Sequence, residues 1–576
     1  MFLSPLKLLE FRQKLQLSIL IFLMILTSLL EVIGIGSVPV FIITLLNENN
    51  SFEYFSINIS FFKNYSDSQL LIGFSVFIFF IFFIKNIIFI VTNLLQFIFL
   101  KNFVKKLSNL VFSNYIKKNY QFHLNTNPAF ILRNVTTETD ATKLYLLAVI
   151  NIFRDFILII FVTVFLLFYN FYITFISLSF MISSTILYFI LFVRKLEVIG
   201  KKNLVAKAEH IKSINNTFWL IKLIKLHNKS NYFMNQFNKV IEVRYYIDAL
   251  IAIFKSINKP FIEITGITLL VLIIILAAST NLRDQIIILL ATYAIALSRI
   301  GPLFGSINAN LNAFKFYKPS VKIIMEIISQ SKSNIYKKNY EFKESINFVD
   351  VSFHYQNSKI PTIEKINLDI KKHDIVGFFG KTGSGKSTIL NLLLGLIRPT
   401  AGSIFLNGKK IKINDDLLIS NAGYIPQDNL LVDDKIVKNI AFGCEDNEIN
   451  YDKINDVIKL AQLEVFIDKL PDGLDTLIGE RGIRLSGGQI QRINIARALY
   501  YNSEILVMDE ATSALDNNTE SEFINSVEKL KGKKTIIIVS HRQSIMKLCN
   551  KIFYLKDKSI TFEGDYIEFK KKYNLD

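Results

Sequence analysis

The sequence predicts two successive domains of different fold class: a polytopic α-helical membrane domain with six transmembrane helices, then a soluble α/β domain. The chain has 576 residues, more than one ordinary domain of about 100–200 residues. Apolar runs of membrane-spanning length occur in the N-terminal half, and short alternating strand and helix patterns follow residue 344. The charge is also uneven. Residues 341–576 carry 32 basic and 33 acidic side chains, a net of −1, so the formal +18 of the chain belongs to residues 1–340, which carry +19.

Six runs are long enough to cross a bilayer, which takes about 20 mainly apolar residues. The first is too long, and is followed by too many others, to be a cleaved signal peptide. The predicted spans are Leu17–Leu46, Leu70–Leu100, Leu144–Phe168, Tyr172–Val193, Ala249–Ala278 and Gln285–Leu311.

The basic excess of the first half has two interpretations, a nucleic-acid-binding surface or the positive-inside bias of a membrane protein. The six spans favour the second, and we expect no nucleic-acid partner. An even number of spans places both chain ends on one side, together with the base-rich connections Lys101–Lys143 and Arg194–Tyr246. The other side holds Lys63 and Arg283. The base-rich side is therefore predicted to be cytoplasmic.

The predicted domain boundaries follow from these patterns. Residues 1–330 form the membrane domain with long cytoplasmic helical loops, residues 331–344 a polar linker, and residues 345–576 the α/β domain. Both cysteines, Cys444 and Cys549, fall in the α/β domain, where the cytoplasm keeps thiols reduced.

A glycine-rich segment lies between the apolar strand Ile375–Phe379 and the helix Ile389–Gly395, which is the context of a phosphate-binding loop. Its backbone amides and the following helix N-terminus suit phosphate oxygens. Lys386 is expected to reach the β- and γ-phosphates of a nucleotide, and Ser387 to bind Mg²⁺. The predicted binding residues are Gly380, Lys381, Thr382, Gly383, Ser384, Gly385, Lys386, Ser387 and Thr388.

Two acidic residues end the apolar strand Ile505–Met508. Asp509 is placed to hold Mg²⁺, and Glu510 to polarise the water that attacks the γ-phosphate. A nucleoside triphosphatase with Mg²⁺ is therefore predicted.

The segment Leu485-Ser486-Gly487-Gly488-Gln489 makes the chain resemble ATP-binding-cassette (ABC) transporters over essentially its whole length. The resemblance implies an exporter-like (type IV) ABC fold and an ATP site with several further residues. It implies that Tyr355 stacks on adenine, that Gln427 links the Mg²⁺ site to the membrane domain, and that His541 contacts the γ-phosphate. Gly479–Gly482 matches the exporter-type segment before the signature, and Asp516 lies in the dimer-contact loop.

In the family, Ser486, Gly487, Gly488 and Gln489 serve the nucleotide held by the partner subunit. One membrane domain and one ATPase domain make half a transporter, so two copies are expected to enclose two ATP. A homodimer is the simplest assembly, and a heterodimer with a related half stays open.

Several charged residues fall within the predicted spans, where charges are costly and usually face a cavity or one another. Internal pairing is one interpretation, with Lys259 and Glu263 paired one helical turn apart, and with Arg154 and Asp155 each paired with a residue elsewhere in the bundle. A basic cavity for an anionic headgroup is the other, with Lys85, Lys259 and Arg299 on its wall. They include Glu31, Lys85, Arg154, Asp155, Lys259, Glu263 and Arg299.

These charges resemble those of the bacterial lipid-linked oligosaccharide flippases of the ABC family. The aromatic outer loop Glu48–Ser68 is a second feature that would suit a lipid substrate. The sequence thus predicts an ATP-driven flippase of an amphipathic, anionic lipid-linked oligosaccharide or related glycolipid in the bacterial inner membrane. A multidrug or lipid-A-type exporter and a non-pumping ATP-gated channel are the alternatives.

Overall fold

The computed structural model describes residues 4–45, 67–279, 286–330, 341–355, 358, 360–411, 422–427, 430–479, 485–511 and 517–573. The chain divides into two compact units. The first comprises residues 1–118 and 126–333, and the second comprises residues 119–125 and 334–576. The predicted outer loop before residue 67 and the predicted linker before residue 341 lie outside the described residues.

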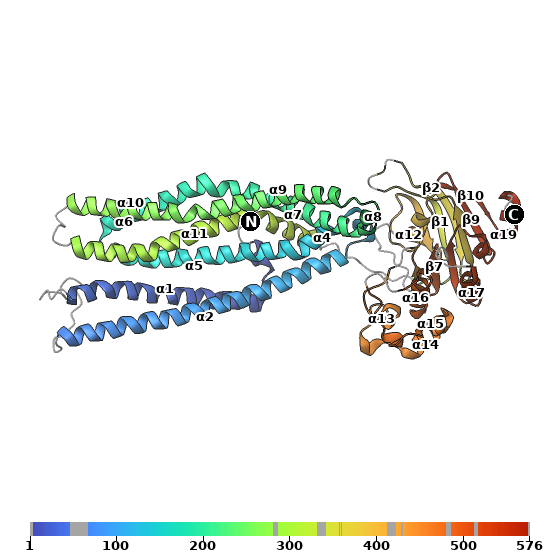
Figure 1. Ribbon diagram of the computed structural model, residues 1–576, viewed down its shortest axis with the longest axis horizontal. Coiled ribbons are helices and arrows are strands. Elements are labelled where there is room, and N and C mark those ends of the chain that lie inside the picture. Colours follow the sequence, from blue (N-terminus) through green and yellow to red (C-terminus); the bar gives the residue numbers. More distant parts are fainter. Residues whose placement is uncertain are drawn as a thin grey trace. The chain divides into compact units, whose positions relative to one another are not determined.

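The first unit is a bundle of long helices with short helical segments at one end (Figure 1). Helices α1 and α2 pack together as a hairpin, while α5 packs against α11. The helices are α1 (Phe11–Leu45), α2 (Asp67–Ile116), α4 (Pro128–Arg133), α5 (Thr139–Tyr169), α6 (Phe171–Tyr188), α7 (Arg194–Trp219), α8 (Ile221–Leu226), α9 (Ser230–Ser256), α10 (Asn258–Ser279) and α11 (Ile286–Ser329). A short 3₁₀ helix (Ser4–Leu8) precedes them, and π-helical turns lie at Asn134–Glu138 and Phe189–Val193.

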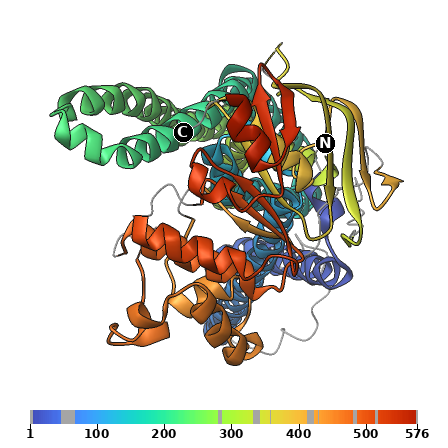
Figure 2. The same cartoon turned by 90° about the vertical axis from the view of Figure 1, so that its right-hand side faces the viewer.

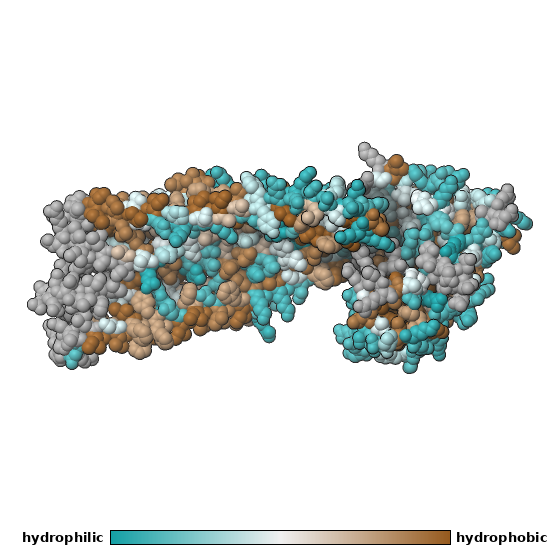
Figure 3. Space-filling view, in the orientation of Figure 1, coloured by the Kyte–Doolittle hydropathy of each residue, from teal (hydrophilic) through white to brown (hydrophobic). Residues whose placement is uncertain are grey.

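Apolar side chains cover much of the outside of this bundle, as expected for helices that face lipid rather than water. Figure 3 shows them gathered over α2 and α10. Phe79, Phe83 and Ile90 on α2 are 62%, 52% and 57% exposed, and Ile267 and Ile275 on α10 are similarly open. The interior has its own apolar core, in which Ile35, Val162, Leu269, Ile273 and Tyr293 are buried.

Five helical stretches of the described residues are long and apolar enough to cross a membrane. They correspond to the first five predicted spans. The sixth predicted span falls at the start of α11, where several side chains lie outside the description. The five stretches are Phe11–Ser37, Ile72–Ile116, Pro128–Phe168, Phe171–Trp219 and Ser230–Ile275.

The fifth predicted span is interrupted near its N-terminal end, where α9 stops at Ser256 and α10 begins at Asn258. Pro260 has no amide hydrogen to donate to the carbonyl of Ser256, which explains the break. Asn258 Nδ2 instead donates to the backbone oxygen of Gly305 at 2.8 Å, which ties the break to α11.

The second unit is an α/β domain with two sheets, seen in Figures 1 and 2. An antiparallel sheet has the order β2-β1-β4-β5, and a larger sheet has the order β10-β9-β3-β8-β7-β6, parallel except for β10. The strands are β1 (Ser345–Phe353), β2 (Ile363–Lys371), β3 (Ile375–Gly380), β4 (Ala401–Leu406), β5 (Lys409–Lys410), β6 (Ala422–Ile425), β7 (Ile505–Asp509), β8 (Thr535–Val539), β9 (Lys551–Lys556) and β10 (Ser559–Gly564).

Helices pack against the larger sheet and bury its faces. The central strands β7 and β8 are buried at every position, as continuous apolar strands in a parallel sheet should be. The helices of this unit are α12 (Lys386–Leu393), α13 (Ile436–Ile440), α14 (Tyr451–Leu460), α15 (Glu464–Ile467), α16 (Gly487–Tyr500), α17 (Asn517–Glu528), α18 (Gln543–Met546) and α19 (Tyr566–Tyr573), with 3₁₀ turns at Asp446–Glu448 and Gly473–Asp475. The unit also includes the short helix α3 (Tyr120–Asn125), which buries none of its residues.

Helix α7 approaches α11 closely at Gly200, which gives a test of the bundle packing. A Cβ atom at this position would lie 2.2 Å from the backbone oxygen of Phe316. We expect Gly200→Ala to lower the free energy of unfolding by about 1–3 kcal/mol, the usual cost of overpacking. Thermal unfolding of the purified full-length chain in detergent measures it. Gly266→Ala is the matched control, because nothing lies within 4 Å of that Cβ position. Equal melting temperatures for the two variants would contradict the observed packing.

Candidate functional site

The predicted ATP-site residues meet at one edge of the larger sheet, where neighbouring parallel strands end. Gly380 ends β3, Asp509 ends β7, and Glu510 follows it directly. His541 comes two residues after β8, and Gln427 two residues after β6. Because parallel strands have their carboxyl ends at the same edge, segments far apart in the sequence are brought together here, in the usual ligand position of an open α/β sheet.

The phosphate-binding loop has the backbone that its glycines permit. Gly383 and Gly385 have φ angles of +82° and +103°, in the left-handed region that residues with a Cβ avoid. A Cβ at Gly385 would also lie 2.5 Å from Ile363 Cγ2. Ser384 Oγ is buried and has no hydrogen-bond partner among the described residues, so the loop keeps a polar group available for a ligand.

Lys386 begins α12 and is only 6% exposed. Its ammonium donates to the backbone oxygens of Gly380 at 2.8 Å and Lys381 at 3.0 Å, which folds the side chain over the loop. Burial lowers the pKa of this ammonium, and the carboxylates of Glu510 and Asp509 oppose that shift. A partly desolvated cation held at this loop is suited to an anionic phosphate chain.

The Glu510 carboxylate is held from two sides. Gln427 Nε2 donates to its Oε2 at 2.8 Å, and His541 Nε2 lies 3.1 Å from its Oε1. Glu510 itself has a φ of +51°, uncommon for a residue with a side chain, and its amide donates to the backbone oxygen of Val539 at 2.8 Å. Strained backbone of this kind is often found at functional sites. Of the four residues with predicted catalytic roles, Gln427 and His541 thus each contact Glu510, while Lys386 lies at the phosphate loop.

The remaining phosphate-loop residues differ in exposure. Lys381, Thr382 and Ser387 are exposed, while Thr388 is 5% exposed. Tyr355 Oη lies 3.3 Å from Thr388 Oγ1, so the aromatic residue predicted to stack on adenine does border the phosphate loop. Its ring packs edge-on against Phe353.

The signature residues stand at the N-terminus of α16. Ser486 is the N-cap: its Oγ accepts from the Gln489 amide at 3.3 Å, and Gln489 Oε1 accepts from the Ser486 amide at 2.8 Å. This capping box leaves the first amides of the helix, at Gly487 and Gly488, pointing outward. No described hydrogen bond joins the signature to the phosphate loop. Asp516 and residues 480–482 lie outside the described residues.

The side chains at this edge of the sheet are suited to bind Mg²⁺. Ser387, Asp509 and Gln427 offer a hydroxyl, a carboxylate and an amide oxygen, the hard donors that Mg²⁺ prefers. The described residues contain no group of three His, Cys, Asp or Glu side chains able to hold a metal. One carboxylate with neutral oxygens fits Mg²⁺, which is usually bound together with substrate phosphates rather than in an all-protein cage.

The charges of the membrane-spanning helices form separate clusters. Glu31 on α1 pairs with Lys85 on α2, with Nζ–Oε2 at 2.6 Å, and with Arg299 on α11, with Nε–Oε1 at 3.5 Å. The Phe82 ring lies beneath both cations. Two of the three residues predicted to line a basic cavity are therefore together, joined by an acid whose role was not predicted.

The third residue, Lys259, is apart from this cluster. Its side chain is 85% exposed and reaches Glu263 at 3.9 Å, the pairing expected within one helix. The expectation of distant partners for Arg154 and Asp155 is wrong, because they pair with each other at 2.9 Å. Adjacent residues of a helix do not share a face, so their spacing in the sequence did not predict this pair. The long, flexible Arg154 side chain allows the contact.

The role of Glu510 gives a direct test of the site. We expect Glu510→Gln to lower the rate of ATP hydrolysis by about 10²–10⁴-fold, the usual contribution of a general base, while ATP binding persists. Phosphate release and binding of a fluorescent nucleotide are measured on the full-length chain. Glu528→Gln, at the exposed end of α17, is the matched control. Wild-type turnover in Glu510→Gln would show that the catalytic assignment is wrong.

Comparison with known proteins identifies the family. The sequence model described as "ABC transporter" matches residues 363–513. A Rickettsia prowazekii protein named for an export ATP-binding and permease function is 31% identical over 399 residues, 66% of this chain and 67% of that protein. An ATP-dependent lipid A-core flippase of Pasteurella multocida is 32% identical over 324 residues, 55% of each chain.

The solved structure of a bacterial Atm1-family ABC exporter with ATP bound has the same fold. It matches with a TM-score of 0.79 over 97% of this chain and 96% of that chain, at 19% identity. The fold, the apolar helices and the ATPase motifs agree with the sequence relatives. The chain therefore belongs to the ABC transporter family, as a multi-pass half-exporter whose ATPase domain couples ATP hydrolysis to transport.

Proposed function

We propose that this half-exporter moves an amphipathic, anionic glycolipid, either a lipid-linked oligosaccharide or a lipid-A-type lipid, across the bacterial inner membrane. The observation that carries the proposal is the cluster of Glu31, Lys85 and Arg299 in the spanning helices, where two cations share one carboxylate. Its net charge of +1 is costly in a bilayer unless an anion or water approaches it. Relatives named as lipid A-core flippases support the lipid class.

Within this cluster, Arg299 is the group suited to bind the headgroup. Lys85 is close to the carboxylate at 2.6 Å, and its side chain is only 13% exposed. Arg299 meets Glu31 only through Nε, at 3.5 Å, and its side chain is 44% exposed. The terminal nitrogens of its guanidinium are thus left for a phosphate, which they bind as a two-point fork. Glu31 and Lys85 would hold Arg299 in place.

The ATPase residues have the following proposed roles. Lys386 and the loop amides bind the phosphates, Tyr355 stacks on adenine, and Gln427 and His541 orient the Glu510 carboxylate toward the attacking water. Because His541 would contact the γ-phosphate, hydrolysis would require that the γ-phosphate is bound in the site. Ser387, Asp509 and Gln427 would hold Mg²⁺, which neutralises charge on the phosphates when bound.

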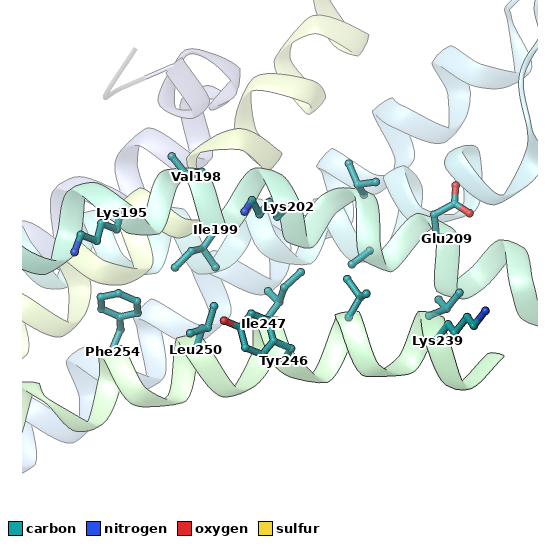
Figure 4. A pocket seen from close by; sticks show the side chains of 14 residues that line it. Lys195, Val198, Ile199, Lys202, Glu209, Lys239, Tyr246, Ile247, Leu250 and Phe254 are labelled. Atoms are coloured by element: carbon teal, nitrogen blue, oxygen red, sulfur yellow. The ribbon is translucent and has the colours of Figure 1, made fainter. Parts of the chain in front are cut away.

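The functional assembly is proposed to be a homodimer. An apolar groove of about 970 Å³ lies between α7 and α9, and Figure 4 shows side chains of the two helices facing one another across it. Val205, Val243 and Tyr246 line it and are 62%, 57% and 65% exposed. Figure 2 shows these helices, in green, standing apart from α1 and α2. This part of α7 and α9 is expected to lie outside the bilayer, where a large exposed apolar surface would be unfavourable. We therefore propose that a second copy of the chain covers it.

Both chain ends and the ATPase domain are proposed to be cytoplasmic. The support is the distribution of bases, which are concentrated in the connections that share a side with the chain ends. In this orientation the ATP site has access to cytoplasmic ATP.

The proposed homodimer can be tested by measuring the mass of the purified protein. Purified chain in detergent should have a protein mass of twice 66.3 kDa by light scattering. Val243→Arg should shift it toward the monomer, because an unpaired charge would be buried in the interface. The control is Val349→Arg, on exposed β1 of the other unit. A dimer that is unchanged by Val243→Arg would rule out the groove as its interface.

The substrate gives a second prediction. In proteoliposomes, Arg299→Lys should slow ATP-dependent movement of a fluorescent lipid-pyrophosphate glycan or of labelled lipid A by about tenfold or more, since a charge-assisted hydrogen bond contributes about 1.5–3 kcal/mol. Basal ATP hydrolysis should change little. Lys259→Gln is the control, because Lys259 is exposed and paired with Glu263.

Comparison of the two probes decides the subclass of substrate. Movement of only one of them assigns the exporter to that lipid. Active ATP hydrolysis with no movement of either lipid would reject the proposed substrate class.

A further inference from the structure

A buried carboxylate lies close to the ATP site but has no role in the function described above. Glu520, in the first turn of α17, is 6% exposed. Its Oε2 forms an ion pair with Arg542, and its Oε1 accepts a hydrogen bond from Ser544 Oγ at 2.5 Å. A carboxylate this buried needs compensation, and Glu520 obtains it from two residues of a single segment.

That segment begins with His541. Arg542 follows His541 directly, and Ser544 is two residues further on. On the other side, the Arg542 amide donates to Ser540 Oγ at 3.0 Å, and Ser540, which directly follows β8, is 3% exposed. The backbone that carries His541 is thus held between the end of a central strand and the carboxylate of Glu520.

The imidazole of His541 has less support of its own. Its side chain is 39% exposed, and the nearest ring, that of Phe379, lies 6.3 Å away between centroids. The contact between His541 Nε2 and Glu510 Oε1, at 3.1 Å, therefore depends on where the backbone places the ring. Small displacements of a catalytic group are costly: about 1 Å can lower a rate a hundredfold.

We propose that Glu520 is a positioning residue for ATP hydrolysis, which acts by holding the His541 segment through Arg542 and Ser544. It touches neither Glu510 nor the phosphate loop among the described contacts, so its effect passes through His541. The inference rests on the proposed role of His541 in hydrolysis. The sequence offers no spacing signal for it, because Glu520 and Arg542 are 22 positions apart on different elements.

The test is a double-mutant cycle in the full-length chain, with ATP hydrolysis measured as kcat and KM. Glu520→Gln keeps the size of the side chain and removes its charge. We expect it to lower kcat about tenfold, with KM for ATP changed less than about twofold, because the phosphate loop is intact. In a His541→Ala background, measured by single turnover with enzyme in excess, the same substitution should change the rate less than about twofold.

The controls separate positioning from loss of structure. Glu528→Gln, on the exposed end of the same helix, should leave kcat unchanged. If Glu520→Gln does not fold, as judged by thermal unfolding, Ser544→Ala replaces it in the same double-mutant cycle. This variant removes one of the two contacts of Glu520, so a smaller loss of kcat is expected. Equal loss of kcat with and without His541 would overturn the proposal. Normal kcat in His541→Ala alone would instead contradict the proposed role of His541.

Discussion

The cost of removing a charge from water shapes both units of this protein. An ion without a partner in a low-dielectric interior is strongly destabilising, so each buried charge must have an opposite charge or several dipoles beside it. Lys386 meets this need with two backbone oxygens, Glu520 with Arg542, and Asp155 with Arg154. In the spanning helices Glu31 does so with Lys85 and Arg299. The buried ions therefore act as fixed points that relate one helix or strand to another.

These fixed points are also where the chemistry is proposed to occur. At the ATP site, Ser384 Oγ is buried without a hydrogen-bond partner among the described residues and is therefore available to a phosphate. In the membrane unit, Arg299 contacts Glu31 through Nε, and the two terminal nitrogens of its guanidinium stay available for a ligand. A partly satisfied charge is held in position and can still bind a ligand, which a fully paired one such as Lys85 does less well.

The parallel sheet explains how distant motifs become one site. The strands β3, β8, β7 and β6 are neighbours, and their carboxyl ends bring Gly380, His541, Glu510 and Gln427 to one edge. Hydrogen bonding then refines this placement, because Gln427 and His541 approach opposite oxygens of the same carboxylate. A change at either neighbour would move Glu510, so these residues should behave as a unit rather than as independent contributors.

The sequence alone predicted a helical membrane domain, an α/β domain and the residues of the phosphate-binding loop, because these depend on local properties. A long apolar run must span or be buried, and glycine spacing dictates which backbone conformations the loop can adopt. The pairing of Lys259 with Glu263 was one of the two interpretations that the sequence allowed, since one helical turn separates them.

Only the tertiary structure decided which charges meet across elements. Glu31 lies 54 residues from Lys85 and 268 from Arg299, and Glu520 lies 22 from Arg542, separations that helical or strand periodicity does not constrain. The same holds at the break near Ile257: Pro260 accounts for the break, but only the structure shows that Asn258 there donates to the backbone oxygen of Gly305. Contacts of this kind arise from packing of whole elements, and packing is not a local property of the chain.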